Sequence, residues 1–81
     1  MRAPYISVFR EDGGMPVLRR LREIRERQFL TQAELAKRSG IAEMTISRLE
    51  LGRHPARLTT ARKLAEALGV HPAELVGEPS R

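Results

Sequence analysis

The sequence has no cysteine and no tryptophan, and aromatic residues make up only 4% of its 81 residues. Without cysteine the chain has neither disulfides nor thiolate metal ligands. With so few aromatic residues, a core has to be built from Leu, Ile, Val and Ala, a composition that suits small, closely packed helices. At this length we expect one small domain.

Long hydrophobic runs are also missing. No apolar stretch approaches the roughly 20 residues of a membrane-spanning helix. The first residues, MRAPYISVFRED, lack the apolar centre of a signal peptide. We therefore expect a soluble, cytoplasmic protein.

Acidic residues are fewer than basic ones. The chain has 10 Asp and Glu against 15 Lys and Arg, which gives a formal net charge of +5 and a pI near 11.0. This balance favours an anionic partner, most often nucleic acid and less often a membrane surface. The alternative is that the charge serves solubility alone.

No group of residues supports catalysis or metal binding. The two histidines, His54 and His71, have no neighbouring ligand at a useful spacing. No pair of carboxylates suggests acid–base chemistry, and the glycines fall at the ends of predicted helices. We expect a protein that is not an enzyme, with no catalytic residues, no metal and no cofactor.

The chain divides into an N-terminal arm, residues 1–14, and a domain, residues 15–81, that holds a helix-turn-helix. In the arm, YISVF is typical of a strand and EDGG breaks it. The arm is either strand-forming or disordered, or Met15 is the true initiator. In the domain, Pro16 suits the first position of a helix that runs to about residue 28. Its apolar stripe recurs every three residues, at Leu18, Leu21 and Ile24.

The stretch TQAELAKRSG has the signals of a short second helix. Thr31 is a good N-cap, Glu34 completes a capping box, and Gly40 suits a left-handed C-terminal residue. A third helix is predicted over residues 42–51. Two short helices joined by a short turn that contains glycine form a helix-turn-helix pattern. Further helices are predicted from residue 58 or 59 to 68 and over residues 72–76, the last with Leu75 and Val76 facing the core.

Three segments, LTQAELA, SGIAEMTISRLELG and KLAEALGV, follow one another at a specific spacing. Together they resemble the Cro/repressor-type helix-turn-helix family, also called the xenobiotic-response-element type. The resemblance covers roughly residues 17–77. It implies an all-α, compact five-helix domain whose second helix crosses the DNA backbone and whose third helix enters the major groove.

The second and third helices are predicted to bury a joint core of Leu35, Ala36, Ile41, Ile46 and Leu49. The opposite face of the third helix holds the candidate base-contacting residues. Arg48 suits guanine O6 and N7, with a phosphate contact or a surface ion pair as the alternative. Glu43 suits cytosine N4, or serves only the helix macrodipole. Met44 suits a thymine methyl group or the groove floor, or packs in the core. Thr45 and Ser47 complete the set and can reach bases or phosphates.

Candidate phosphate contacts frame this helix. Gln32 matches a family position that contacts phosphate at the start of the second helix. Arg53 and Arg57 flank the start of the fourth helix, and Arg38 is a weaker candidate. His54 is either a proton-dependent contact or a plain loop residue.

Four positions bear on the stability of the fold: two match the pattern of the family and two depart from it. Arg25 and Glu50 fall where the family often has an internal ion pair. Phe29 stands where the family favours a left-handed glycine, so either the turn differs or burial of the ring offsets the strain. Ala42 stands where Ser or Thr usually caps the third helix.

The resemblance implies a sequence-specific transcriptional regulator, a repressor, that binds double-stranded DNA as a homodimer. Dimer contacts in the family often use the C-terminal helices, so Leu75 and Val76 are candidates, together with Leu51. Self-pairing of the YISVF arm is the alternative. The second hypothesis is an antitoxin-like or adaptor protein whose main role is to bind a partner protein.

Overall fold

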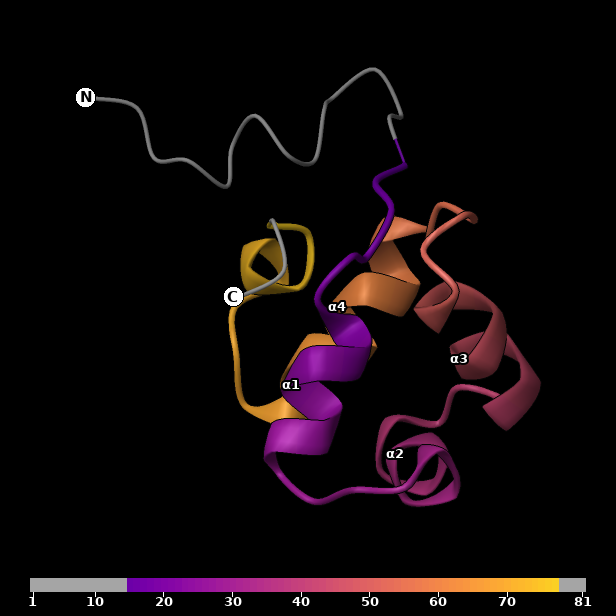
Figure 1. Cartoon of the computed structure of the whole chain (residues 1–81), viewed down its shortest axis with the longest axis vertical. Helices are drawn as coiled ribbons and strands as arrows, with labels where there is room; N and C mark the ends of the chain where they lie inside the picture. The colour runs from indigo at the N-terminus through magenta and orange to yellow at the C-terminus, as the bar shows by residue number, and fades with distance from the viewer. Residues whose placement is uncertain (1–14, 78–81) are drawn as a thin grey trace.

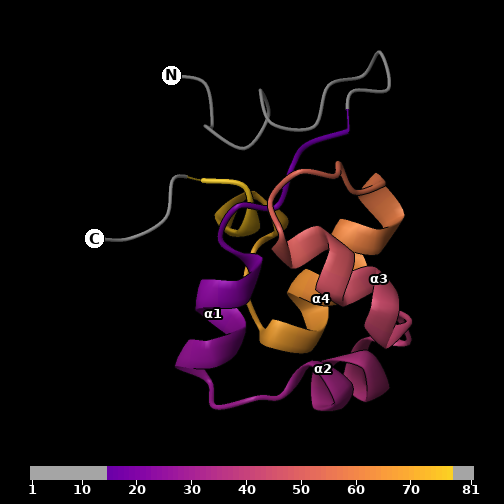
Figure 2. The ribbon, with the colours of Figure 1, turned by 45° about the vertical axis from the view of Figure 1, so that its right-hand side comes forward.

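The computed structural model describes residues 15–77, which are all-helical apart from loops and one isolated bridge. Its elements are α1 (Leu21–Arg27), α2 (Gln32–Ser39), α3 (Glu43–Glu50), α4 (Leu58–Leu68) and the 3₁₀ helix η2 (Pro72–Leu75), drawn in Figure 1. Helix α2 packs against α3 and α4, and η2 packs against α4. Helix α1 packs against α3. In Figure 2, α2 lies at the bottom of the view, below α3 and the lower end of α4. The predicted all-α class is therefore correct.

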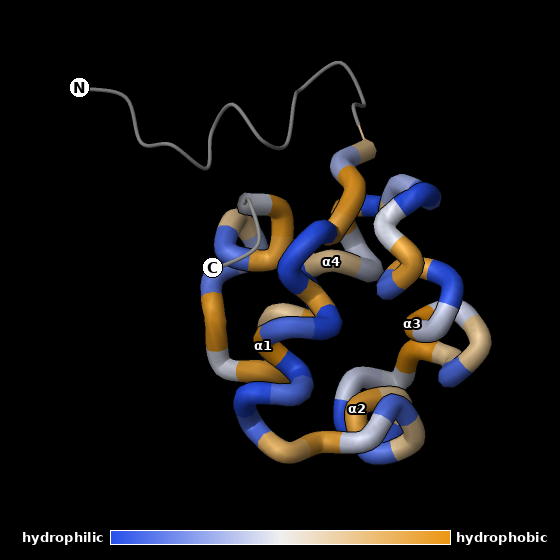
Figure 3. The backbone as a smooth tube through the Cα atoms, viewed as in Figure 1, coloured by the Kyte–Doolittle hydropathy of each residue, from blue (hydrophilic) through white to orange (hydrophobic). Residues whose placement is uncertain are grey.

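The core is built from aliphatic residues, as the shortage of aromatic residues requires. Hydrophobic and hydrophilic residues alternate along α1 and α2 in Figure 3, because each helix has one inward face. Since helices of this length are marginal alone, burial of a shared core holds them together. The largest fully buried side chains come from every helix and from the segment before α1: Leu18, Leu21, Leu35, Ile46, Leu64 and Leu75.

The first helix begins later than predicted. Pro16 is not its first residue, because α1 starts at Leu21. Val17 instead forms an isolated antiparallel bridge with Pro55, and the carbonyl oxygen of Pro16 accepts a hydrogen bond from the N–H of Ala56 at 2.8 Å. The segment before α1 therefore satisfies its backbone groups with the loop between α3 and α4 instead of within a helix.

The capping box at the start of α2 is present as predicted. The Thr31 Oγ1 atom accepts from the Glu34 N–H at 3.0 Å, and the Glu34 Oε1 atom accepts from the Thr31 N–H at 2.8 Å. The backbone of Thr31, followed by its side chain, holds the pKa of the Glu34 carboxyl group below its ordinary value. Gly40 then ends α2 at φ 76°, in the left-handed region. By contrast, Ala42 gives α3 no side-chain cap.

The predicted count of five helices is not confirmed. The residues from Pro72 to Leu75 form a single turn of 3₁₀ helix, so the described residues contain four α-helices. His71 caps this turn, because its Nδ1 atom accepts from the Ala73 N–H at 3.1 Å. Leu75 is 0% exposed. It belongs to the core and is not available to another chain, so its prediction as a dimer contact is wrong.

The predicted arm, residues 1–14, lies outside the described residues. Over residues 15–77, no helix is long and apolar enough to cross a membrane. Over the same range, no three acidic, histidine or cysteine side chains are placed to hold a metal ion.

Candidate nucleic-acid interface

The helix-turn-helix consists of α2, the turn after it and α3. Leu35 from α2 and both Ile46 and Leu49 from α3 are buried, while Ala36 and Ile41 pack against them at the edge. These are the residues that the sequence pattern places in the joint core. Because this packing holds one face of α3 against the domain, the opposite face of α3 is left to solvent.

The outward face of α3 brings together the residues predicted to contact bases. Glu43, Met44, Ser47 and Arg48 are exposed, and Thr45 is half-buried at the edge. Met44 is 77% exposed, so the alternative of core packing is wrong. Within residues 15–77, the polar side chains of this face form no hydrogen bond or ion pair. Their donors and acceptors are therefore available to a ligand.

The charged residues fall into a paired set and an unpaired set. On α1, Arg22 pairs with Glu26 at 3.1 Å and Arg27 pairs with Glu23 at 2.5 Å, so the acidic residues of α1 offset its basic ones. Apart from Arg19, the cations with no hydrogen bond or ion pair in the described range lie on α2, α3, α4 and the loop before α4: Lys37, Arg38, Arg48, Arg53, Arg57, Arg62 and Lys63. The uncompensated positive charge is thus concentrated on the helix-turn-helix and α4, which suits a polyanionic ligand.

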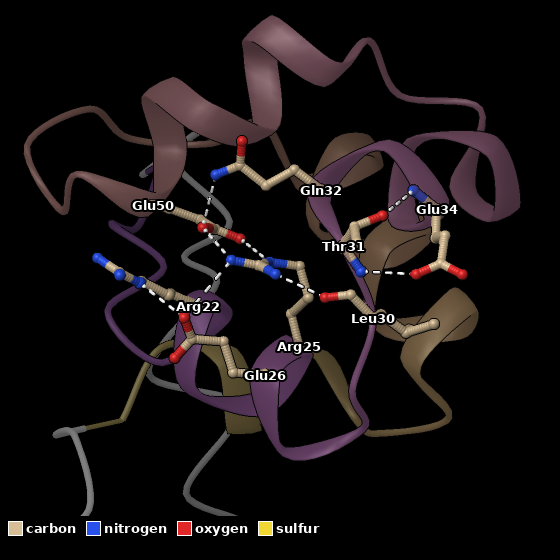
Figure 4. A network of polar contacts seen from close by, with 8 residues as sticks. All are labelled: Arg22, Arg25, Glu26, Leu30, Thr31, Gln32, Glu34 and Glu50. Carbon is tan, nitrogen blue, oxygen red and sulfur yellow. Dashed lines mark hydrogen bonds and ion pairs between the residues drawn. The ribbon is translucent and has the colours of Figure 1, made fainter.

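A buried polar network joins α1 to α3 (Figure 4). Arg25 donates from Nε to Glu50 Oε2 at 2.6 Å and from Nη2 to Glu50 Oε1 at 3.0 Å. Its Nη1 atom donates to the carbonyl oxygen of Leu30 at 2.6 Å. The hydrogen bond to Glu50 is the main reason that the pKa of Arg25 is raised above its ordinary value. The ion pair expected at these two positions is therefore present.

Gln32, the first residue of α2, is a further member of this network. Its Nε2 atom donates to Glu50 Oε1 at 2.9 Å. The family resemblance predicts a phosphate contact for Gln32 but not this hydrogen bond to Glu50. No local pattern points to it, because the two residues lie on different helices and only tertiary packing brings them together.

The other candidate phosphate contacts lie at separate places on the surface. Arg38 is exposed in the last turn of α2. Arg53 and His54 are exposed in the loop after α3, and Arg57 is the exposed N-cap residue of α4, with no side-chain capping bond. The structure therefore keeps the side chains of all four accessible.

Phe29, in the turn before α2, departs from both expectations for it. Its φ angle is 59°, so the left-handed geometry is kept. The residue is also 93% exposed, so burial does not offset the strain. A non-glycine residue in the left-handed region costs roughly 1–2 kcal/mol. Within residues 15–77, burial of the ring therefore contributes almost nothing against this cost.

An all-helical domain that exposes an unpaired polar face on the second helix of a helix-turn-helix belongs to a known class, the helix-turn-helix DNA-binding domain. The helix-turn-helix family model matches residues 21–75 of the chain. The chain belongs to the Cro/repressor-type helix-turn-helix family of DNA-binding transcriptional regulators.

Similar proteins carry names of the same kind. An uncharacterized HTH-type transcriptional regulator of Methanothermobacter thermautotrophicus is 47% identical over 49 residues, which cover 60% of this chain and 71% of that protein. The regulator PuuR of Escherichia coli is 33% identical over 70 residues, or 86% of this chain and 38% of PuuR. The immunity repressor protein of Bacillus phage phi105 is 33% identical over 64 residues, or 79% of this chain and 44% of the repressor. The match thus spans less than half the length of the last two.

One solved structure has a closely similar fold. It is the restriction-modification controller protein C.AhdI from Aeromonas hydrophila, which is 39% identical with a TM-score of 0.66. The superposition covers 69% of this chain and 85% of that chain.

Proposed function

We propose that the protein is a sequence-specific transcriptional regulator, a repressor, that binds double-stranded DNA as a homodimer and reads the major groove with α3. The observation that carries the proposal is the exposed face of α3, whose polar side chains have no partner within the described part of the chain. A major groove admits an α-helix and presents a distinct pattern of donors, acceptors and methyl groups for each base pair. The exposed face of α3 supplies a hydrogen-bond donor in Arg48, an acceptor in Glu43 and an apolar contact in Met44.

Each side chain of the face has a matching group on a base edge. Arg48 donates two parallel hydrogen bonds to guanine O6 and N7. Glu43 accepts from cytosine N4, and its place in the first turn of α3 also lets the helix dipole favour its charge. Met44 contacts a thymine methyl group. Thr45 and Ser47 bond to bases or to nearby phosphates. The half-site therefore contains both a C·G and a T·A pair.

Phosphate contacts position this helix in the groove. Gln32 binds a phosphate at the N-terminus of α2, where the helix dipole favours an anion. Arg53 and Arg57 bind the backbone beside the start of α4, and Arg38 adds a contact from the end of α2. All three arginines are exposed and unpaired in the described range.

The proposed dimeric state is supported by the geometry of helix-turn-helix binding sites, and the proposed repressor role is supported by a similar protein. One helix-turn-helix domain reads about half of a site, so two copies on an inverted repeat place their half-sites about 10 base pairs apart. The immunity repressor protein of phage phi105 supports the sign of regulation. Leu51, 65% exposed, and the half-buried Val76 remain candidate dimer contacts.

Selection of binding sites from random duplex DNA tests the proposal. We expect an enriched inverted repeat with C·G and T·A pairs in each half. Glu43→Gln should shift the preferred base at one position, and Glu66→Gln is the matched control, because it makes the same charge change on the exposed side of α4. A selection that enriches no motif would contradict sequence-specific binding.

An adaptor that mainly binds another protein is the second candidate. Its support is the exposure of two large apolar side chains, Leu51 and Phe29, each of which could contact a partner protein. Arg48→Ala and Glu43→Ala separate the two candidates. If neither change alters affinity for the selected DNA at fixed moderate salt, the groove-reading role of α3 is wrong and the adaptor role is favoured.

A further inference from the structure

The carboxylate of Glu50 is almost fully enclosed. Its side chain is 4% exposed, and it receives three hydrogen bonds, two from Arg25 and one from Gln32. Arg25 is itself held in place, because its third donor group binds the carbonyl oxygen of Leu30. The carboxylate of Glu50 is therefore held in one position by its partners.

The carboxylate of Glu50, paired with Arg25, determines how the Gln32 amide is oriented. An ionised carboxylate only accepts hydrogen bonds, so the group of Gln32 that faces it has to be the NH₂ group. Figure 4 shows the Gln32 nitrogen directed at Glu50 and its carbonyl oxygen directed away. One N–H of Nε2 is used by Glu50 at 2.9 Å, and the second N–H has no partner within residues 15–77.

The same end of α2 has further donors to offer. Thr31 accepts from the N–H of Glu34, but the backbone N–H groups of Gln32 and Ala33 have no acceptor in the described chain. The first N–H groups of a helix have no partner inside the helix. Gln32, the first residue of α2, therefore offers two donors that are unpaired within the described residues, its backbone N–H and the second N–H of its Nε2 atom.

We propose that Glu50 is a positioning residue for DNA binding, which holds the Gln32 amide so that its second N–H binds the phosphate at the N-terminus of α2. Glu50 is also the last residue of α3. The contact thus ties the phosphate-binding end of α2 to the helix that reads the bases, and sets the register between the two. This inference rests on the proposed function.

The test uses the full chain and the selected duplex, with single phosphates replaced in turn by neutral methylphosphonates. In the wild-type protein, one replacement should lower affinity about tenfold, because a hydrogen bond to a charged group is lost. In Gln32→Ala, the same methylphosphonate replacement should lower affinity only about threefold, because only the backbone N–H groups of α2 still bind that phosphate.

The decisive variant is the double change Arg25→Met/Glu50→Leu. It removes both buried charges together, and apolar replacements of similar volume often preserve or raise stability. If Glu50 positions Gln32, this variant keeps most of the wild-type stability but shows the reduced, threefold penalty of Gln32→Ala. Glu50→Gln is a second variant, in which the new amide can itself donate and no longer dictates the orientation of Gln32; the same reduction is expected. Glu66→Gln controls for the change in net charge.

The outcomes separate the two proposals. If the double variant and Glu50→Gln bind with the full tenfold penalty at the same phosphate, Glu50 is only a stabilising residue and the inference is overturned. The inference also fails if no methylphosphonate effect depends on Gln32. In both cases the proposed function stands, provided the wild-type protein still enriches a motif. Failure to enrich any motif overturns the proposed function itself.

Discussion

The carbonyl oxygen of Pro16 accepts a hydrogen bond from the backbone N–H of Ala56 at 2.8 Å. Ala56 is buried, and the bridge between Val17 and Pro55 lies next to this bond. Residues from the start of the domain thereby hold the loop that carries Arg53 and Arg57. A loop without regular structure thus has a defined backbone position on the surface that we assign to phosphate binding.

We expect Arg57→Ala to weaken DNA binding almost equally for all sequences. Each phosphate contact releases counterions, so the slope of log affinity against log salt should become shallower by about 0.9. The measurement is the affinity for selected duplex DNA at several salt concentrations. Arg22→Ala is the control, because Arg22 is already paired with Glu26 on α1 and should leave the slope unchanged. Equal effects of the two changes would argue against the assigned surface.

The buried ion pair predicts a large asymmetry between single and double variants. Arg25→Met leaves the Glu50 carboxylate buried without its cation, and should lower the free energy of unfolding by about 3–5 kcal/mol. Arg25→Met/Glu50→Leu should recover most of this loss. Urea unfolding followed by circular dichroism measures both. A double variant that is as unstable as the single one would show that packing, not the uncompensated charge, causes the loss.

The uncapped start of α3 predicts a stabilising change. Ala42 has an extended backbone, with φ −57° and ψ 140°, and makes no side-chain capping bond. Ala42→Ser should therefore raise the free energy of unfolding by about 1 kcal/mol. Ala33→Ser, at an exposed position in the first turn of α2, is the control and should give no gain, because Thr31 already caps that helix. Thermal melting compares the two, and equal shifts would contradict a capping effect.

The strained turn at Phe29 predicts that glycine is better there. Phe29→Gly removes the steric cost of φ 59° and loses no buried surface, so the free energy of unfolding should rise by about 0.5–1 kcal/mol after the entropic cost of glycine. Phe29→Ala keeps the strain and should change little. Chemical denaturation of both variants tests the assignment. A gain in Phe29→Ala as large as in Phe29→Gly would place the cost in the ring and not in the backbone.

The capping box predicts a component of acid sensitivity. Because the pKa of Glu34 is lower in the folded chain than in the unfolded chain, its contribution to stability is present above the unfolded value and is lost as the pH falls through the folded value. In Glu34→Gln, the glutamine can still complete the capping box, but its side chain does not titrate. From about pH 5 downward, the wild type should lose stability more steeply than this variant. Parallel pH profiles of unfolding would contradict the prediction.

Local signals in the sequence were sufficient for much of the helix-turn-helix. The Thr31–Glu34 capping box and the left-handed Gly40 depend on residues within one helical turn, so they are visible in the chain itself. The apolar spacing also predicts which face of α3 is buried, and hence which residues form the candidate site. The positions of Arg25 and Glu50 came from the family resemblance. That these two residues pair in this chain is shown by the structure.

Other features were decided by contacts between segments distant in the chain. Pro16 has the local properties of a helix start, yet the loop at Ala56 takes its backbone carbonyl, and α1 begins later. For Leu75 the sequence left two roles open, a core residue of the last helix and a dimer contact implied by the family, and packing against α4 decides for the core. The bond from Gln32 to Glu50 has no signature in either helix. Periodicity reports how residues of one segment share a face, whereas the partner of that face depends on how the segments pack in three dimensions.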